Sequence, residues 1–137
     1  MLIEMLRAKL HRARVTDADL NYVGSLTIPR DVLELSGIRD GEKIAVVNVN
    51  NGARFETYVQ TGKKRGRYCL NGAAARLGEV GDVIIVFAYA LMDEEEAARH
   101  RPRILLFDER NRVSRALGPA PGPRGKPKAK ARKGRRR

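Results

Sequence analysis

The chain has 137 residues, a length typical of one domain, and 42% apolar residues, enough for a buried core. Its net charge is +12, but the last twenty residues hold nine of the 28 Lys and Arg and no acidic residue, which leaves residues 1–117 with a net charge of +3. This distribution argues against a domain whose whole surface binds nucleic acid.

The sequence also excludes several other classes of protein. No apolar run approaches the ~20 residues needed to span a bilayer, and charges interrupt the N-terminal segment where a signal peptide needs a continuous apolar stretch. One cysteine, Cys69, cannot form an internal disulfide or a Cys-based zinc site, and two histidines are too few for a typical His-built metal site. We therefore expect a soluble, cytoplasmic protein without a bound metal and without membrane contact.

The first expected element is a strand. Apolar and charged residues alternate from Leu6 to His11, which is the period of a strand and puts Lys9 and His11 on one face. A helix over residues 2–10 is also compatible with this short stretch.

Short strands and short helices, separated by Gly, Pro and Asn, follow along the chain. The expected elements in the first half are a turn or helical connector at 16–20, a strand at 22–28 interrupted by Gly24, a helix at 30–35 between Pro29 and Gly37, and strands at 44–49 and 54–59 around a hairpin turn at 50–52. A basic loop at 61–66 follows, and residues 68–70 lead into a turn that opens a short helix at 71–77. The last expected elements are a strand at 83–90 buried on both faces, a helical turn from Asp93, and strands at 103–107 and 112–117. This series predicts one mainly β domain over residues 1–117, a compact β-barrel whose interior is filled by side chains.

Residues 118–137 form a low-complexity tail rich in Lys, Arg, Pro and Gly. The tail has no large apolar residue, so it cannot bury enough surface to offset its ordering entropy, and we expect it to be disordered. Two interpretations of its charge remain open: non-specific, salt-dependent binding to RNA, DNA or anionic surfaces, and a solvated tail with no dedicated partner.

The dipeptide Gly24–Ser25 is the first candidate for chemistry. A serine hydroxyl in a strained turn can attack the preceding carbonyl, and glycine lets the backbone bend into reach. The peptide bond becomes an ester, and β-elimination followed by hydrolysis converts the serine to a pyruvoyl group with release of ammonia. A simple bulge is the commoner explanation of an isolated Gly-Ser pair, so this hypothesis depends on the surrounding residues.

The strand expected at 54–59 carries Arg54, Thr57 and Tyr58. Arginine suits the bidentate binding of a carboxylate, a tyrosine can donate a proton, and a threonine can hydrogen-bond a carbonyl. Strand alternation places Arg54 and Tyr58 on one face and Thr57 on the other. Ordinary strand composition explains the threonine and the tyrosine equally well.

A third candidate is the turn formed by Asn71, Gly72, Ala73 and Ala74, which presents backbone N–H groups at the expected start of a helix. Such a turn can hold a substrate carboxylate, although Asn71 as a plain helix cap is the alternative. Lys9 and His11 are likewise compatible with a solvated strand face, and Cys69 with a small buried residue.

A partial pattern competes with these candidates. Residues 24–49 resemble the swapped-hairpin DNA-binding domains of bacterial transition-state regulators and antitoxins, because they read as strand, Pro-started helix, Gly stop, Gly turn and strand. This pattern mostly encodes turn geometry, and it gives the alternative hypothesis of a DNA-binding regulator with a basic tail.

A wider resemblance covers Met1 to about Leu117. Five short motifs resemble those of the pyruvoyl-dependent aspartate 1-decarboxylase family, and they occur in the same order along the chain. Each motif alone is weak evidence, but together they are specific. They are Met5–Arg12, Thr16–Ser25, Asn51–Tyr58, Asn71–Ala75 and Val80–Val83. The loop at 61–68 is about one residue shorter than the family pattern, and the basic tail is not part of that pattern.

This resemblance implies a double-psi β-barrel that assembles as a homotetramer, with active sites between neighbouring subunits. It implies self-cleavage between Gly24 and Ser25, a pyruvoyl group made from Ser25 in place of pyridoxal phosphate or a metal, and conversion of L-aspartate to β-alanine and CO₂ for pantothenate and coenzyme A synthesis. By similarity, Tyr58 would protonate the carbanion equivalent that forms when CO₂ leaves a substrate–pyruvoyl Schiff base.

The same resemblance implies roles for the remaining candidates. Lys9 and Arg54 would bind carboxylate with His11 nearby, and Thr57 would activate the Gly24 carbonyl and contact substrate. The turn at 71–74, comprising Asn71, Gly72, Ala73 and Ala74, would position the substrate and the ester intermediate.

Overall fold

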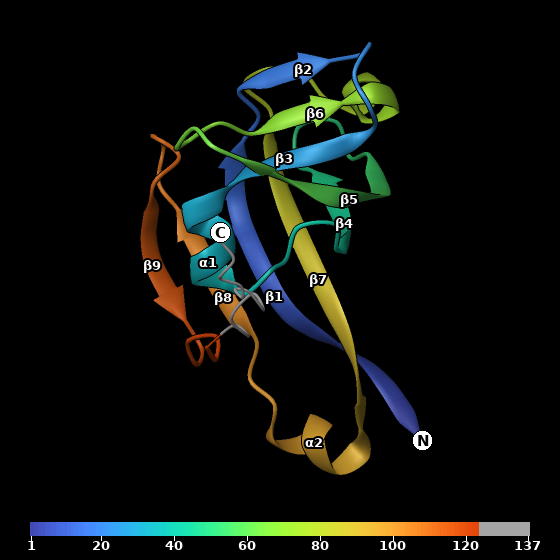
Figure 1. Ribbon diagram of the computed structural model, residues 1–137, viewed down its shortest axis with the longest axis vertical. Helices are drawn as coiled ribbons and strands as arrows, with labels where there is room; N and C mark the ends of the chain where they lie inside the picture. Colours follow the sequence, from blue (N-terminus) through green and yellow to red (C-terminus); the bar gives the residue numbers. More distant parts are fainter. Residues whose placement is uncertain (124–137) are drawn as a thin grey trace, which may run out of the picture.

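The computed structural model of the chain describes residues 1–123 (Figure 1). Nine strands form one sheet in the order β2-β6-β3-β5-β4-β7-β1-β8-β9. The strands are β1 (Leu2–Arg14), β2 (Asp17–Asp19), β3 (Ser25–Pro29), β4 (Lys43–Asn48), β5 (Arg54–Gly62), β6 (Cys69–Asn71), β7 (Val83–Asp93), β8 (Arg103–Phe107) and β9 (Val113–Leu117). The helices are α1 (Arg30–Ser36), the 3₁₀ helix η1 (Gly72–Leu77) and α2 (Glu94–Arg99).

The longest pair of strands in the sheet is the antiparallel pair of β1 and β7. In Figure 1 this pair extends toward α2 and the N-terminus. The segment Leu6–His11 lies within a strand of thirteen residues, so the strand prediction is confirmed and the helical alternative is wrong. Register shifts interrupt the pair after Leu6 and His11, and Arg12 takes the positive φ of 73° at the second shift. Such bulges bend the strand, and this curvature lets the sheet close around a core.

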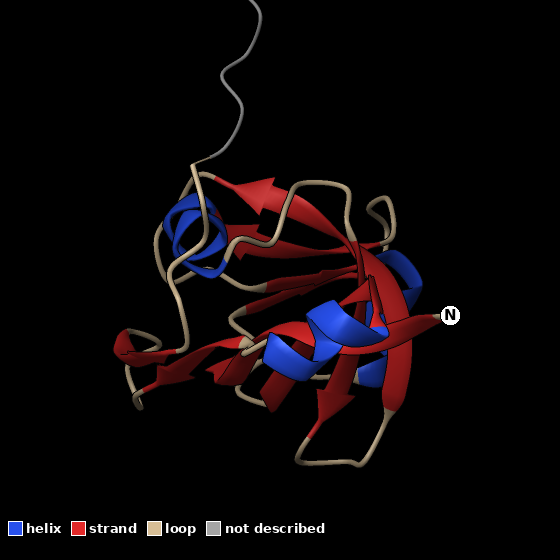
Figure 2. Ribbon diagram, turned by 90° about the horizontal axis from the view of Figure 1, so that it is seen from below, coloured by secondary structure: helices blue, strands red, loops and turns tan. Residues whose placement is uncertain are grey.

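Parallel pairs connect strands that are distant in the sequence: β1 with β8, β2 with β6, and β3 with β5. Figure 2 shows the strands curling around one interior, with the short helices at its margin. The prediction of a small, mainly β barrel with short helices is confirmed, and the parallel crossovers agree with the double-psi arrangement that the resemblance implies.

The core lies on the inner face of the curved sheet and contains side chains from most strands and from α1. Its largest fully buried members are Tyr68, Leu10, Leu26, Ile28, Ile38, Ile44, Leu70, Ile84 and Leu105. The expectation that residues 83–90 are buried on both faces is wrong. Only alternate residues of β7 are fully buried from Ile84 on, because Ile85, Phe87 and Tyr89 point to the outer face.

Local predictions held where a turn residue determines the structure. Gly37 ends α1 with the left-handed φ of 84° and donates its N–H to Leu33 O, as expected for this cap. The short helix expected after Asn71 is present as the 3₁₀ helix η1. The connector expected at 16–20 instead contains the short strand β2.

The chain beyond β9 continues along the barrel. The Arg103 side chain donates to Gly118 O at 3.1 Å, and a Cβ on Gly37 would lie 3.1 Å from Pro121 Cβ, so residues 118–122 pass close to the body of the fold. The disorder and polyanion binding expected of the basic tail fall mainly on residues 124–137, which lie outside the described residues. The domain boundary at 117/118 stays a prediction.

Candidate active site

Ser25 begins β3 and is completely buried. Its Oγ donates a hydrogen bond to Gln60 Oε1 at 2.9 Å and accepts one from Asn71 Nδ2 at 2.9 Å. Gln60 Nε2 in turn donates to Tyr22 Oη at 3.0 Å. A buried hydroxyl with both a donor and an acceptor in place has a fixed orientation, which is what a nucleophile next to its target carbonyl requires.

Asn71 connects this serine to its neighbours. Its Nδ2 also donates to Thr27 Oγ1 at 2.9 Å, its Oδ1 accepts from Cys69 Sγ at 3.0 Å, and its backbone pairs with Ser25 across β3 and β6. Burial raises the pKa of the Cys69 thiol, which keeps the proton that this bond needs. Asn71 makes no side-chain cap to η1, so the alternative of a plain helix cap is wrong.

Gly72 approaches the backbone of Gly24 very closely. Gly72 has a φ of 63°, and a Cβ on it would lie 2.7 Å from Gly24 Cα and 2.9 Å from Tyr22 O. Gly24 itself has no positive φ, and a Cβ there would meet only Asn71 O at 3.9 Å. The expected close approach at Gly24 is therefore present, but the left-handed backbone that requires glycine is at Gly72.

We expect Gly72→Ala to block cleavage at Gly24–Ser25, because the new methyl group would push the scissile segment away from Ser25 Oγ. Gly52→Ala is the matched control: Gly52 also has a positive φ, of 76°, but within residues 1–123 no atom beyond its chain neighbours lies within 4 Å of the added Cβ. The control should lose about 1–2 kcal/mol of stability through backbone strain and still cleave. Gel analysis of both purified variants measures this, and equal cleavage in the two would contradict the steric argument.

The outer face of β5 extends the site away from Ser25. Alternation along the strand puts Arg54, Glu56, Tyr58 and Gln60 on this face, with Tyr58 about 7 Å from Gln60 along the strand. The Tyr58 side chain is 41% exposed and forms no hydrogen bond within residues 1–123. Tyr58 therefore lies on the same face as the Ser25 network, with a free hydroxyl.

Lys9 and His11 lie on the same outer face, across the sheet from β5. Backbone pairing links Arg54 to Val47, Val47 to Ile85, and Ile85 to His11, so Arg54 and His11 occupy one row. Lys9 Nζ lies 5.7 Å from the centre of the Phe87 ring, and Phe87 and Arg54 line one groove of about 250 Å³. The sequence-predicted cations Lys9 and Arg54 thus border a common surface with His11.

The imidazole of His11 is held in an environment that disfavours its charged form. Its Nδ1 is buried without a hydrogen-bond partner among the described residues. Burial, and then the positive charges of Lys9 and Arg12, lower the pKa of His11 from its ordinary value of 6.5. The residues that pair with it on β7 and β8, Ile85 and Leu106, carry no titratable group.

This lowered pKa predicts how stability depends on pH. Between the lowered value and 6.5, the unfolded chain binds more protons at His11 than the folded chain, so the free energy of unfolding falls as the pH drops through this window. We expect His11→Gln to remove this contribution, so that the variant loses less stability than the wild type between pH 7.5 and pH 5.5, roughly one unit either side of 6.5. Urea unfolding at several pH values measures the difference, and parallel curves would show that His11 makes no contribution.

Three of the predicted residues lie apart from the Ser25 network. Thr57 pairs with Ile44 on β4, shares the inner side of β5 with Val59, and makes no hydrogen bond through its hydroxyl within residues 1–123. Ala74 packs into the core, whereas Ala73 is exposed. The structure therefore brings Ser25 together with Asn71 and Gly72, but it does not bring Thr57 to the serine hydroxyl.

Sequence reasoning missed two residues that contact this network, Gln60 and Thr27. Gln60 lies two residues beyond Tyr58, and Thr27 lies two residues beyond Ser25, so strand alternation could have placed both on the active face. The backbone pairing of Thr27 with Gln60 brings them together, and this pairing is parallel between distant strands. Local patterns do not predict such a pairing.

Two findings concern the part of the chain that the structure describes. No group of three or more His, Cys, Asp or Glu side chains there is arranged to hold a metal ion. None of the helices there is long and apolar enough to cross a membrane.

Comparison with known proteins identifies the family. A sequence model described as "Aspartate decarboxylase" matches residues 1–114. The chain belongs to the aspartate decarboxylase family. The resemblance carried by the separate motifs is thereby confirmed, and the alternative of a swapped-hairpin DNA-binding regulator is not supported.

Curated relatives in this family match nearly their whole length. The aspartate 1-decarboxylase of Helicobacter pylori (strain J99) is 55% identical over 113 residues, which cover 82% of this chain and 97% of the relative. Those of Geobacillus sp. (strain WCH70) and Caldicellulosiruptor bescii are 53% and 55% identical, over 85% and 84% of this chain and 93% and 91% of the relatives. The family match ends before the basic tail begins.

Proposed function

We propose that this protein is a self-processing, pyruvoyl-dependent aspartate 1-decarboxylase that converts L-aspartate to β-alanine and CO₂. Family membership makes the chain a decarboxylase, and its relatives are named for aspartate. The observation that carries the proposal is the buried Ser25 hydroxyl, fixed by Asn71 and Gln60 directly after Gly24. β-Alanine is a precursor of pantothenate, so the reaction supplies coenzyme A synthesis.

Self-cleavage begins when Ser25 Oγ attacks the Gly24 carbonyl carbon. The C–N bond breaks, the amino group of Ser25 becomes free, and an ester joins the two parts of the chain. Loss of the Ser25 Cα proton and breakage of the Cβ–Oγ bond then release the Gly24 carboxylate and leave dehydroalanine. Uptake of water and loss of ammonia complete the pyruvoyl group, with residues 1–24 and 25–137 as separate chains.

The surrounding residues fit a group built at this position. The amide of Asn71 donates to Ser25 Oγ, and Gln60 accepts its proton in a hydrogen bond, so the two amides orient the hydroxyl without acting as bases. Gly72, which has no side chain, lets the backbone of Gly24 lie directly against it. When formed, the group supplies an electrophilic ketone that condenses with the substrate amine and accepts the electrons released with CO₂.

The cations of the outer face would bind the substrate. Within residues 1–123, neither Arg54 nor Lys9 forms a side-chain hydrogen bond or an ion pair, and Lys9 lies over the Phe87 ring, so both are available to carboxylates. Tyr58 lies on the face that also carries Gln60, and it would donate a proton to the substrate carbon after CO₂ leaves. The roles of His11, Thr57, Ala73 and Ala74 rest on the resemblance to the family.

We propose that a neighbouring protomer of a homotetramer completes this site. In one protomer the groove beside Arg54 is small, and apolar side chains remain exposed on the outer face. Tyr58 and Tyr89 are 41% and 42% exposed there. A second subunit over this face would exclude water from the reaction and strengthen the pairing of carboxylates with Lys9 and Arg54. The location in the cytoplasm stays a prediction.

Gln60 gives a sharp test of the cleavage geometry. We expect Gln60→Leu to slow self-cleavage about 10-fold, since it removes one hydrogen bond that orients Ser25 Oγ while keeping the side-chain volume. Tyr22→Phe is the control, because it removes only the hydrogen bond between Gln60 Nε2 and Tyr22 Oη and keeps the bond between Gln60 and Ser25. The measurement is the rate at which the full-length chain disappears after purification, and equal rates in Gln60→Leu and the wild type would show that Gln60 does not orient the hydroxyl.

The proposed function itself is tested with purified, fully processed protein. We expect aspartate to be consumed with equal amounts of β-alanine and CO₂, and borohydride in the presence of aspartate to inactivate the enzyme by covalent reduction on residues 25–137. A processed protein that leaves aspartate unchanged would contradict the substrate assignment. An active enzyme with an intact Gly24–Ser25 bond would contradict the proposed origin of the electrophile.

A further inference from the structure

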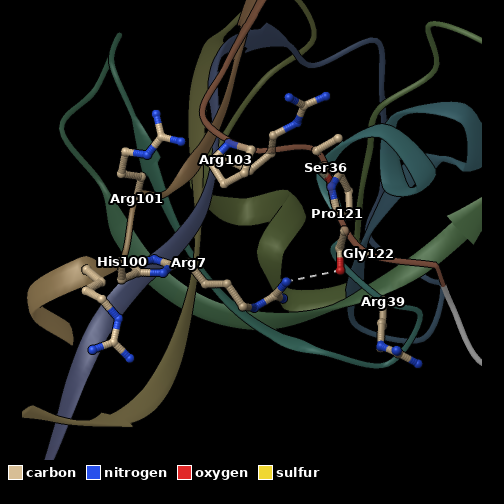
Figure 3. Close-up of a pocket in the computed structure, with 12 residues that line it drawn as sticks. Arg7, Ser36, Arg39, His100, Arg101, Arg103, Pro121 and Gly122 are labelled. Carbon is tan, nitrogen blue, oxygen red and sulfur yellow. Dashed lines mark hydrogen bonds between the residues drawn. The ribbon is translucent and has the colours of Figure 1, made fainter. Parts of the chain in front are cut away.

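A second cavity, lined by residues outside the Ser25 network, contains an unusual concentration of arginine (Figure 3). Its volume is about 450 Å³, within the range of small-molecule sites. It lies between β1, the end of α1, the end of α2 with the start of β8, and the segment after β9. The basic residues that line it are Arg7, Arg39, Arg99, His100, Arg101 and Arg103. No acidic residue lines it within residues 1–123.

Two of the arginines that line the cavity, Arg7 and Arg103, are held in place by hydrogen bonds. Arg7 Nη1 donates to Gly37 O at 3.1 Å, and the same guanidinium pairs with Glu42. Arg103 donates to Leu35 O at 3.0 Å and to Gly118 O at 3.1 Å. These bonds tie β1, α1 and the segment after β9 into one frame around the cavity, so its basic lining does not depend on a ligand for its shape.

The other guanidinium groups that line the cavity have no partner within the described residues. Arg39, Arg99 and Arg101 form no side-chain hydrogen bond or ion pair with any residue in the described range 1–123. The carboxylate of Glu42 is paired with Arg7 and accepts from the backbone N–H of Arg39, so it does not neutralise the Arg39 guanidinium. Three uncompensated positive charges around one cavity repel each other, and an anion placed among them would remove that repulsion.

We propose that this cavity binds a small molecule that carries two or more phosphate groups. Arginine binds phosphate through two parallel N–H···O bonds, and it does so better than lysine. A single phosphate group would leave part of the lining unneutralised, whereas a diphosphate has enough charge and enough oxygens for three free guanidinium groups. The site is separate from the aspartate reaction and does not depend on it.

Isothermal titration of the full-length protein with inorganic pyrophosphate, at constant ionic strength, tests the proposal. We expect one pyrophosphate per protomer and a dissociation constant at least about 10-fold higher in Arg99→Gln/Arg101→Gln, since each charge-assisted bond accounts for about that factor. Both side chains are exposed and unpartnered, so the double variant should keep the wild-type melting temperature. Arg39→Gln should weaken binding independently.

The matched control is Arg115→Gln, which removes an exposed arginine of β9 that does not line the cavity. It should bind pyrophosphate like the wild type. Equal binding in Arg99→Gln/Arg101→Gln and Arg115→Gln would overturn the proposal and place any binding elsewhere, for example on the basic residues after 123. Absence of binding to the wild type, or binding of orthophosphate as tight as that of pyrophosphate, would also overturn it.

Discussion

Ser25→Ala is expected to abolish self-cleavage and leave a single chain of 15.3 kDa. The substitution removes the only atom that can form the ester, Ser25 Oγ, and replaces a fully buried side chain by a smaller one. It leaves Asn71 Nδ2 with its second acceptor, Thr27 Oγ1, so the fold should persist. Without a pyruvoyl group, no decarboxylation should remain.

Intact-mass analysis measures this result and its counterpart in the wild type. The wild-type chain should separate into residues 1–24 and 25–137, with the larger fragment lighter by about 17 Da than a peptide that starts with serine, because ammonia has been lost. Ser114→Ala is the control, since this exposed serine lies on β9 and its hydroxyl donates to Leu106 O, far from the Gly24–Ser25 bond along the chain. Cleavage of Ser25→Ala at the same bond would refute a serine-dependent mechanism.

Tyr58→Phe is expected to leave self-cleavage intact and to lower kcat by about 10²–10⁴-fold, the usual loss when a general acid is removed. The hydroxyl is unbonded in the described chain and lies on the outer face, whereas the cleavage network depends on Ser25, Gln60 and Asn71. The ring itself remains in the variant, so substrate packing should change little and KM should stay near its wild-type value.

Tyr89→Phe is a matched control for this experiment. Tyr89 is 42% exposed against 41% for Tyr58, lies on the outer face of β7, and keeps its stacking on Phe87 after the change. We expect it to decarboxylate aspartate at nearly the wild-type rate. A Tyr58→Phe variant as fast as Tyr89→Phe would assign the proton transfer to another group.

The sequence predicted best what short-range periodicity determines. Alternation placed Lys9 with His11 and Arg54 with Tyr58, and the structure keeps each pair on one face of its strand. The two pairs lie on one surface because β5, β4, β7 and β1 are neighbours in the sheet with a fixed register. No local sequence pattern predicts that order or register. Only the resemblance to a family gave that relation in advance.

The glycines show why other details were beyond the sequence. A glycine before a serine pointed to a special backbone at position 24, yet the positive φ occurs at Gly72, forty-eight residues later. The requirement at Gly72 arises from contact with a strand end that is distant along the chain. Such a contact exists only after β3 and β6 have paired, so composition near Gly24 could not reveal it.

The position of β1 in the sheet has a consequence for the processed protein. Cleavage after Gly24 would sever a fragment whose long strand lies between β7 and β8 and is hydrogen-bonded along both edges. The fragment would stay in place as an inserted second chain, so processing would leave the native shape unchanged. Refolding would nevertheless become a bimolecular reaction between the two fragments, so its rate would depend on their concentration. The lifetime of the mature enzyme would thus depend on its unfolding rate, which is set by the activation barrier to unfolding.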